Sequence, residues 1–262
     1  MSAEEDLLLE RDGHIALITV NRPASRNSFT YDMYTRLTAV CAELARDDAV
    51  RVVVMRGAGD DAFVAGSDIT QFLEFRNAEQ ARAYEAHVER AIGGFESLPK
   101  PTIVVLKGSV TGSGAAYATV ADLRIAAPNV RVGIPIARTL GNTLSLRNVA
   151  RMVDTLGVAT TKDLLLTARL LDADECLRRG LVHEVVPLAD IERRVRELAD
   201  QVASLAPLTL RAMKLAVLRT LEARHAALGD GADLVALAYT SEDFREGVRA
   251  FVEKRPPRWT GR

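Results

Sequence analysis

The amino-acid sequence predicts an α/β fold, and three observations support this fold class. Runs rich in β-branched residues alternate with segments of helical spacing from residue 14 to about residue 127. The strand-like runs, such as 52–55, are short and apolar throughout, which is typical of strands covered on both faces. From about Leu144 onward, helical patterns dominate. Such alternation requires crossover connections, so we expect a layered α/β core with a helical C-terminal extension.

The expected strands end at turn-forming or helix-breaking residues. The run 14–20 stops at Asn21-Arg22-Pro23, and the run 51–56 stops at Gly57. Further strands are expected at 102–106, directly after a proline-rich break, and at 123–127.

The expected helices have an apolar face, and several begin at a residue that can cap the first turn. In 30–45 the apolar positions recur with helical spacing behind Thr30, whose hydroxyl can cap the helix. Asp172 and Ser241 are similar start signals. The other expected helices span 78–98, 115–121, 161–167, 172–179, 188–205, 207–228, 231–239 and 241–254.

Size, charge and cysteine content narrow the class of protein. A chain of 262 residues can bury a sizeable core, and its formal net charge of −1 gives no nucleic-acid footprint. The acidic start has no signal-peptide pattern, and the apolar runs are too short to span a bilayer. Cys41 and Cys176 lie far apart, which favours two reduced thiols in a cytoplasmic protein. No group of residues has metal-ligand spacing, so we expect no metal site.

Two glycine-containing turns are the strongest signal for chemistry. One spans Phe63 to Ile69, and the other spans Gly108 to Tyr117 and opens a helix. Each turn can aim a backbone N–H at one carbonyl oxygen, and two such donors form an oxyanion hole for acyl chemistry. The stretch 97–153 around the second turn has a single carboxylate, Asp122. The usual proton carriers are therefore missing beside the expected hole.

Other interpretations of these turns fit less well. A dinucleotide-binding turn needs an acidic residue roughly 20 positions on, and none lies between Asp122 and Asp154. The serines of the turns, Ser67, Ser109 and Ser113, are not in a G-x-S-x-G motif. Among the histidines, only His87 is a site candidate, and a packing role is the simpler interpretation for it.

Two groups of charged residues have an ordinary and a functional interpretation. Five arginines fall in or beside the acid-poor stretch: Arg124, Arg131, Arg138, Arg147 and Arg151. We expect most of them to pair with acids elsewhere, although one or two could face an anionic ligand. Glu85 and Glu89 lie one helical turn apart and could share a catalytic face, but such a pair is usually a solvated surface.

In their order along the chain, these motifs resemble those of the crotonase superfamily, also called the enoyl-CoA hydratase/isomerase family. The similar segments are Asn21-Arg22-Pro23 with Asn27-Ser28, Phe63 to Ile69, Leu98 to Ile103, Gly108 with 112–114, Ala121 to Leu123, Gly180 to Val182 with Val185-Val186, and 241–257. The resemblance covers nearly the whole chain. It implies a β-β-α spiral core with C-terminal helices, assembled as a homotrimer or a dimer of trimers. We assign the acyl-CoA site to the core, residues 1–200, and oligomerisation to the helical region 201–262.

The resemblance also implies site residues. The family stabilises the enolate of an acyl-CoA thioester with two backbone N–H groups, which correspond to Ser67 and Ser113. Coenzyme A enters as part of the substrate, and no permanently bound cofactor is expected. The positions implied for binding substrate and CoA are Arg26, Ala65, Gly66, Asp68, Ile69, Gly112, Ile136, Phe251 and Lys254.

The sequence departs from the family where hydratases carry two glutamates. Counting from Asp122 without gaps, these positions fall on Ala116 and Ile136. The region after them, where other branches carry an aspartate, is Asn142 to Ser145. We therefore expect an acyl-CoA enzyme of the hydratase/isomerase type, a lyase or isomerase of the kind that serves fatty acid metabolism, whose hydration is impaired. The alternatives are other thioester chemistry (decarboxylation, hydrolysis or retro-aldol cleavage) and acyl-CoA binding without turnover. Decarboxylation forms an enolate without a base, and Arg138, Asn142, Thr143 or His87 could then orient the departing carboxylate.

Overall fold

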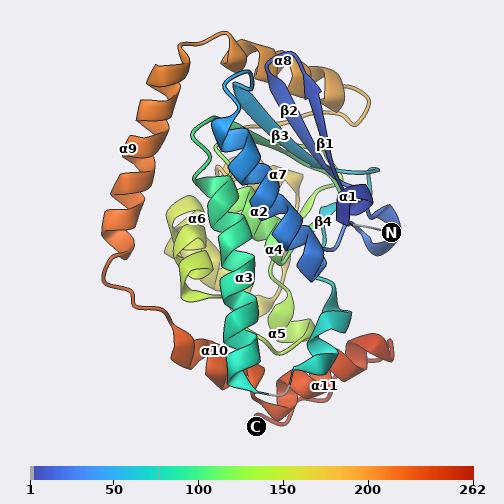
Figure 1. The fold of residues 1–262 in the computed structure, drawn as a ribbon. Coiled ribbons are helices and arrows are strands. Elements are labelled where there is room, and N and C mark those ends of the chain that lie inside the picture. Colours follow the sequence, from blue (N-terminus) through green and yellow to red (C-terminus); the bar gives the residue numbers. More distant parts are fainter. Residues whose placement is uncertain (1–2, 76) are drawn as a thin grey trace.

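The structure, a computed structural model, describes residues 3–75 and 77–262 (Figure 1). Within these residues, helices alternate with strands in the first half and predominate in the second. The elements in chain order are α1 (Ala3–Asp6), β1 (Leu7–Asp12), β2 (Ile15–Val20), η1 (Pro23–Ser25), α2 (Tyr31–Arg46), β3 (Val52–Gly57), β4 (Ala62–Val64), η2 (Ile69–Glu74), α3 (Ala78–Glu96), β5 (Thr102–Leu106), β6 (Ser109–Thr111), α4 (Ser113–Val120), β7 (Leu123–Ala126), β8 (Arg131–Gly133), α5 (Ile136–Thr139), α6 (Leu146–Thr167), β9 (Leu170–Leu171), α7 (Ala173–Arg178), β10 (Glu184–Val185), α8 (Ile191–Ala203), α9 (Pro207–His225), α10 (Ala232–Tyr239) and α11 (Glu242–Val252).

The strands form two sheets of unequal size. The larger has six strands in the order β1-β2-β3-β5-β7-β10, and the smaller has four in the order β4-β6-β8-β9. The pairs β2–β3, β3–β5, β5–β7 and β7–β10 are parallel, and β1 pairs with β2 in antiparallel fashion. The smaller sheet is parallel except where β9 meets β8. The crossover helices expected between parallel strands are therefore present.

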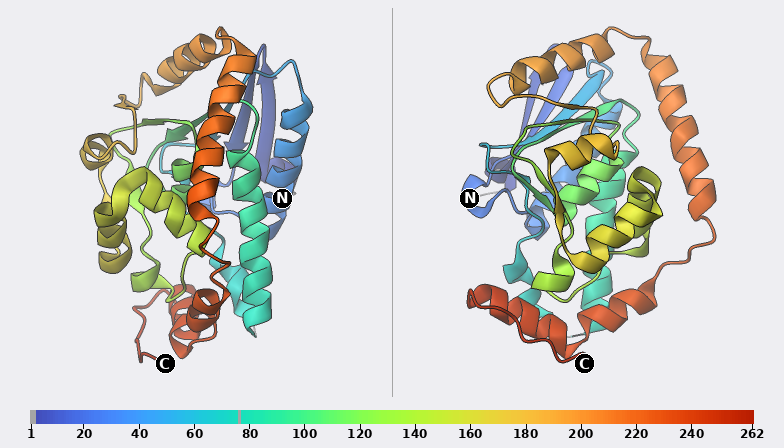
Figure 2. Two further views of the ribbon diagram at one scale, coloured as in Figure 1. Left: turned by 90° about the vertical axis from the view of Figure 1, so that its left-hand side faces the viewer. Right: turned by 180° about the vertical axis from the view of Figure 1, so that it is seen from behind.

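Helices cover both faces of the larger sheet, which explains the continuous apolar runs of its strands. On one face, alternate side chains such as Val52, Val54 and Ile103 pack with Val195 and Ala199 of α8. The opposite face packs against the side of the molecule that holds α2 and α3 (Figures 1 and 2). None of the described helices meets the length and hydropathy that a membrane-spanning segment requires.

The C-terminal helices extend away from the sheets. Helix α9 stands beside the core as a long arm, and α10 and α11 lie beneath the end of α3 (Figure 1). The Lys214 ammonium holds α9 by donating to Asp122 Oδ2 at 2.7 Å and to the Lys100 carbonyl at 3.0 Å. Much of the apolar surface of α9 stays exposed, including Leu208, Met213 and Val217.

Most predicted elements agree with the structure, and the differences concern α6 and several strands. The caps at Thr30, Asp172 and Ser241 are confirmed. Helix α6 begins at Leu146, well before the predicted residue 161, and it bends at Gly157, where φ is +74°. The predicted near-absence of strands after residue 144 is wrong at β9 and β10, which are two residues long. The sequence prediction also lacks the strands β4, β6 and β8, because periodicity cannot be read over three residues. It lacks β1 as well, a six-residue strand whose burial does not alternate along its length.

Candidate active site

The two glycine-containing turns meet because they follow neighbouring parallel strands. β4 pairs with β6, with Val64 opposite Val110. The carboxyl ends of parallel strands lie at the same edge of a sheet, which is where α/β proteins place their ligands. The turn 65–68 leaves β4 at this edge, and α4 begins at Ser113 directly after β6. The sequence prediction that both turns share one site is consistent with this geometry.

Close backbone contact explains the glycines in these turns. Gly66 and Gly112 both have positive φ, +100° and +57°. A Cβ on Gly112 would lie 3.1 Å from the Gly66 Cα atom, so the two turns touch through their glycines. A Cβ on Gly114 would lie 2.0 Å from the Val64 carbonyl oxygen. Larger residues at Gly112 and Gly114 would push the turns apart.

Both predicted donors are N–H groups without a backbone partner. Phe29 N–H donates to the Gly66 carbonyl at 2.9 Å, and Asp68 N–H donates to the Phe29 carbonyl at 2.8 Å. This parallel bridge directs the Ser67 N–H to the other side of the chain. Ser113 is the first residue of α4, so its N–H has no partner within the helix. Among the backbone hydrogen bonds of the described residues, neither N–H donates.

Two buried tyrosines contact the Ser67 side chain. Tyr84 OH donates to Ser67 Oγ at 2.5 Å, and Tyr34 OH lies 2.8 Å from the same atom. Burial is the main cause that raises the pKa of Tyr34 to about 12. The nearby hydroxyls of Ser113 and Ser67 have the opposite, smaller effect and lower this pKa. The Ser113 hydroxyl itself completes no hydrogen bond. Two hydroxyl groups thus contact Ser67 Oγ, and neither tyrosine was identified from the sequence.

The residues predicted to bind CoA along the first turn have structural partners. Arg26 adopts a left-handed conformation, φ +50°, and its carbonyl accepts the Ala65 N–H at 3.1 Å. Asp68 caps η2 by accepting the Thr70 N–H. Burial opposes ionisation of Asp68, but hydrogen bonds from Thr70 and Arg22 outweigh it and lower its pKa. Ile69 packs against the main hydrophobic core.

The two positions predicted to lack glutamates are surrounded by apolar residues. Ala116 lies one turn into α4, where its N–H donates to the Gly112 carbonyl, and its side chain is buried. Ile136 begins α5 and packs against the main core behind the buried Ile134. Both positions therefore present hydrocarbon and no carboxylate.

The predicted C-terminal residues lie at the opposite end of α11 from its N-terminus. Phe251 is half exposed and Lys254 has φ +54°, and both are near the end of α11. The start of this helix is the part that approaches the site, because Phe244 packs on Phe72 of η2 with ring centroids 5.8 Å apart.

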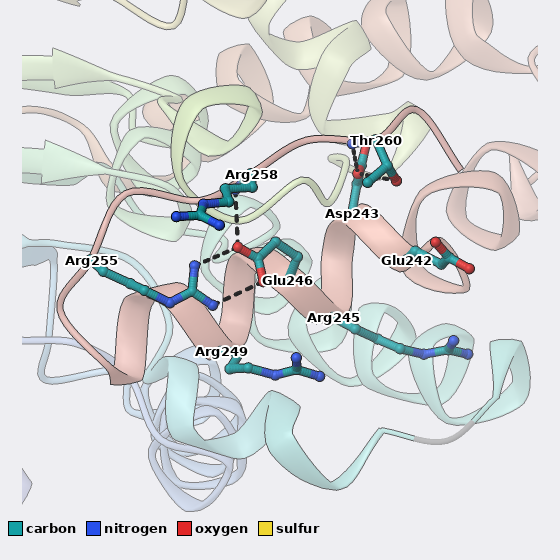
Figure 3. Close-up of a pocket in the computed structure, with 8 residues that line it drawn as sticks. All are labelled: Glu242, Asp243, Arg245, Glu246, Arg249, Arg255, Arg258 and Thr260. Atoms are coloured by element: carbon teal, nitrogen blue, oxygen red, sulfur yellow. Dashed lines mark hydrogen bonds and ion pairs between the residues drawn. The ribbon is translucent and has the colours of Figure 1, made fainter.

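An open cleft of about 660 Å³ lies between α11 and the C-terminal tail (Figure 3). Four arginines line it. Two of them are already engaged, because Glu246 accepts hydrogen bonds from Arg255 Nη2 and from the Arg258 backbone N–H, both at 2.9 Å. Hydrogen bonds from Arg255 are the largest cause that lowers the pKa of Glu246 to about 2. No dashed contact in Figure 3 reaches Arg245 or Arg249. The cleft includes neither Ser67 nor Ser113, so its size does not make it the candidate active site.

Four of the five arginines of the acid-poor stretch are engaged in the fold, whereas Arg138 is exposed. Arg151 is 4% exposed and bonds Glu89 at 2.7 Å and Glu96 at 2.5 Å, and Arg147 also pairs with Glu89 at 3.3 Å. Arg124 and Arg131 donate instead to backbone carbonyls, so for them the prediction of acid partners is wrong. His87 packs on Tyr31 and bonds the Tyr31 carbonyl at 3.0 Å, as its packing interpretation requires.

Glu85 corrects the interpretation of the α3 glutamate pair as solvated surface. Its side chain is partly buried, and Oε1 accepts a hydrogen bond from Tyr239 OH of α10. Tyr239 OH in turn accepts from Asn142 Nδ2 at 3.1 Å. Burial, reinforced by the charge of Glu89, raises the pKa of Glu85 to about 7, although the Tyr239 hydrogen bond lowers it.

Comparison with known proteins identifies the family. The sequence pattern of the enoyl-CoA hydratase/isomerase family matches residues 10–262. The chain belongs to this family. It is 32% identical over 251 residues to a short-chain-enoyl-CoA hydratase of Clostridium acetobutylicum, covering 95% of each protein. It is also 32% identical over 254 residues to a crotonyl-CoA hydratase of Syntrophomonas wolfei, covering 97% of each.

The solved structures agree on the fold. A methylmalonyl-CoA decarboxylase in complex with 2-nitronate-propionyl-CoA matches with a TM-score of 0.87 and 26% identity, covering 98% of each chain. An enoyl-CoA hydratase/carnithine racemase of Magnetospirillum magneticum matches with a TM-score of 0.80 and 31% identity, covering 98% of this chain and 96% of that one. This member of the enoyl-CoA hydratase/isomerase family therefore has the crotonase fold that the resemblance predicted.

Proposed function

We propose that this protein is an acyl-CoA enzyme of the hydratase/isomerase type that stabilises a thioester enolate with the N–H groups of Ser67 and Ser113. The observation that carries the proposal is the meeting of two turns with unpartnered N–H groups at one sheet edge. A developing oxyanion there is also favoured by the N-terminus of α4. Loss of one such donor typically reduces the rate by about 10²–10³-fold.

The acyl-CoA is proposed to lie along the first turn and the start of α4. Arg26, Ala65, Gly66, Asp68, Ile69 and Gly112 would then line the thioester and pantetheine path, and Ile136 would contact the acyl group. Phe251 and Lys254 are proposed to meet the nucleotide end of CoA. Because these two lie at the opposite end of α11 from its N-terminus, we infer that they serve a neighbouring copy in a homotrimer or dimer of trimers. The exposed apolar side chains of α9 support such an assembly.

The apolar residues Ala116 and Ile136 argue against efficient hydration. General acid–base groups contribute about 10²–10⁴-fold each, so the absence of both glutamates should slow water addition by more than one such factor. Restoring them together in Ala116→Glu/Ile136→Glu should raise crotonyl-CoA hydration. Absence of any gain would indicate a pocket shaped for a different acyl group.

Decarboxylation is the second candidate, supported by the similarity to the methylmalonyl-CoA decarboxylase structure. Loss of carbon dioxide leaves the electron pair on the α-carbon, so the enolate forms without a base. Arg138, Asn142, Thr143 or His87 could then orient the departing carboxylate. Arg138, the one cation among these four, is exposed and forms no ion pair within the described residues.

The test is incubation with straight and branched enoyl-, 3-hydroxyacyl-, malonyl- and methylmalonyl-CoA, followed by product masses and direct binding. Water gain on an enoyl thioester supports hydration, and carbon dioxide loss supports the second candidate. A shifted double bond leaves the mass unchanged and is detected by chromatography. Failure to bind any CoA thioester would contradict the proposal as a whole.

A further inference from the structure

Glu85 lies beside the residues that contact Ser67. Tyr84, which precedes it on α3, donates its hydroxyl to Ser67 Oγ at 2.5 Å. The negative charge of Glu85 raises the pKa of both Tyr34 and Tyr84, although burial is the main cause in each case. The carboxyl group is therefore within electrostatic reach of the two hydroxyls that surround Ser67.

The carboxyl group is held at one oxygen and left open at the other. Tyr239 OH donates to Oε1, and Asn142 Nδ2 donates to Tyr239 OH at 3.1 Å. Among the described residues, no group bonds to Oε2, and this atom is not one of the enclosed polar atoms that lack a partner. Glu85 thus has a fixed orientation and a free oxygen.

Within residues 3–75 and 77–262, the groups that face Glu85 carry no positive charge. They are Tyr239 of α10, Asn142 of the segment after α5, Tyr34 of α2, and Tyr84 and Glu89 of α3 itself. Among the described residues, no lysine or arginine forms an ion pair with Glu85, whereas Glu89 pairs with Arg151. Burial without a cation disfavours the charged form and raises the pKa to about 7. Such a group contributes little to stability at neutral pH and is matched to proton transfer.

We propose that Glu85 is the acid–base group that removes and returns the α-proton of the bound thioester, and that Tyr239 and Asn142 position it. The inference rests on the proposed function, because it needs an enolate held by Ser67 and Ser113. In the forward step the α C–H bond breaks, the proton passes to Glu85 Oε2, and the electron pair forms the enolate. In the reverse step the proton returns to carbon and the thioester carbonyl is restored.

The experiment measures exchange of the α-hydrogens of butyryl-CoA in D₂O by mass spectrometry, with binding of butyryl-CoA measured by calorimetry. The wild-type protein should exchange, with a rate that rises as the pH increases through about 7, because the carboxylate form is the base. Glu85→Gln should bind butyryl-CoA normally and exchange at least about 10²-fold more slowly. The rise with pH should also disappear.

Two further variants separate catalysis from structure. Tyr239→Phe keeps the ring that packs on Phe244 but removes the hydrogen bond that favours the charged form, so the midpoint of the pH profile should move to higher pH. Glu85→Asp should restore part of the exchange. Glu79→Gln makes the same chemical change at an exposed position of α3 and should behave as wild type.

The outcomes distinguish this inference from the proposed function. Wild-type exchange and pH profile in a folded Glu85→Gln protein would overturn the role of Glu85 and leave the proposed function intact. Binding of butyryl-CoA without exchange in the wild-type protein would also overturn the role of Glu85. Absence of butyryl-CoA binding in the wild-type protein and in Glu79→Gln would remove the proposed function, and the inference with it.

Discussion

Two glutamates one turn apart in the middle of helix α3 lie in opposite environments. Glu85 lies among tyrosine hydroxyls and an amide, and burial raises its pKa to about 7. Glu89, one turn further on, is bonded by the guanidinium of Arg151, which also reaches Glu96. Burial would lower the pKa of Arg151, but its hydrogen bonds to both glutamates outweigh burial and raise it. The comparison teaches that the partner, more than the helix face, decides whether a carboxyl group is structural or available for proton transfer.

The largest effect is expected where Glu89 and Glu96 of α3 lose their cation. Arg151→Met leaves Glu89 and Glu96 without their shared partner, and breaking a buried ion pair in this way typically destabilises by about 3–5 kcal/mol. Urea unfolding at pH 7 measures the change. A decrease of less than about 1 kcal/mol in the free energy of unfolding would mean that water reaches the ion pairs of Arg151 more than their burial indicates.

Replacing Glu85 by glutamine should change stability in the opposite direction to the same replacement of Glu89. The raised pKa means that the folded protein binds the Glu85 proton more tightly than the unfolded chain does. The resulting stability is present below the ordinary value of 4.5 and is lost as the pH rises through about 7. At pH 8, Glu85→Gln should therefore stabilise by roughly 1–3 kcal/mol, whereas Glu89→Gln should destabilise. Thermal unfolding at pH 5 and pH 8 checks the sign, and equal effects of the two substitutions would break the comparison.

A smaller effect tests the hydroxyl cluster itself. Ser67→Ala removes the atom that both Tyr34 and Tyr84 contact and leaves two enclosed hydroxyls without that partner. We expect a loss of about 1–2 kcal/mol in stability, while the backbone N–H remains in place for the thioester. Chemical denaturation combined with turnover separates the two quantities. A drop in turnover much larger than the loss of folded protein would implicate the Ser67 hydroxyl in the reaction.

The smallest effect belongs to the exposed rim of the charged cluster. Arg147 also pairs with Glu89, at 3.3 Å, but its side chain is 51% exposed. Arg147→Met should change the free energy of unfolding by less than about 1 kcal/mol, and the change should shrink further in high salt. An effect as large as that of Arg151→Met would show that the burial of the arginine does not determine how much its ion pair with Glu89 contributes to stability.

The sequence carried enough information to predict the fold and the two turns, but not the environment of Glu85. The glycines at 66, 112 and 114 are required by backbone contacts, so they stand out in the sequence and mark the turns. The strands of two or three residues that hold the turns in place have no detectable periodicity. Glu85 and Glu89 look equivalent by spacing alone. Their difference comes from Tyr239, which is 154 residues away from Glu85, and from Arg151, 62 residues away from Glu89.

The position of α10 late in the chain also sets when the site can be completed during synthesis. Tyr239 leaves the ribosome 154 residues after Glu85, which at ordinary elongation rates is a delay of roughly 8–30 s. In that interval the strands and α3 can already assemble, but the Glu85 carboxyl stays hydrated because α10 does not yet cover it. A nascent chain should thus hold an ordinary surface glutamate, and the tuned carboxyl group arises only when the final helices dock.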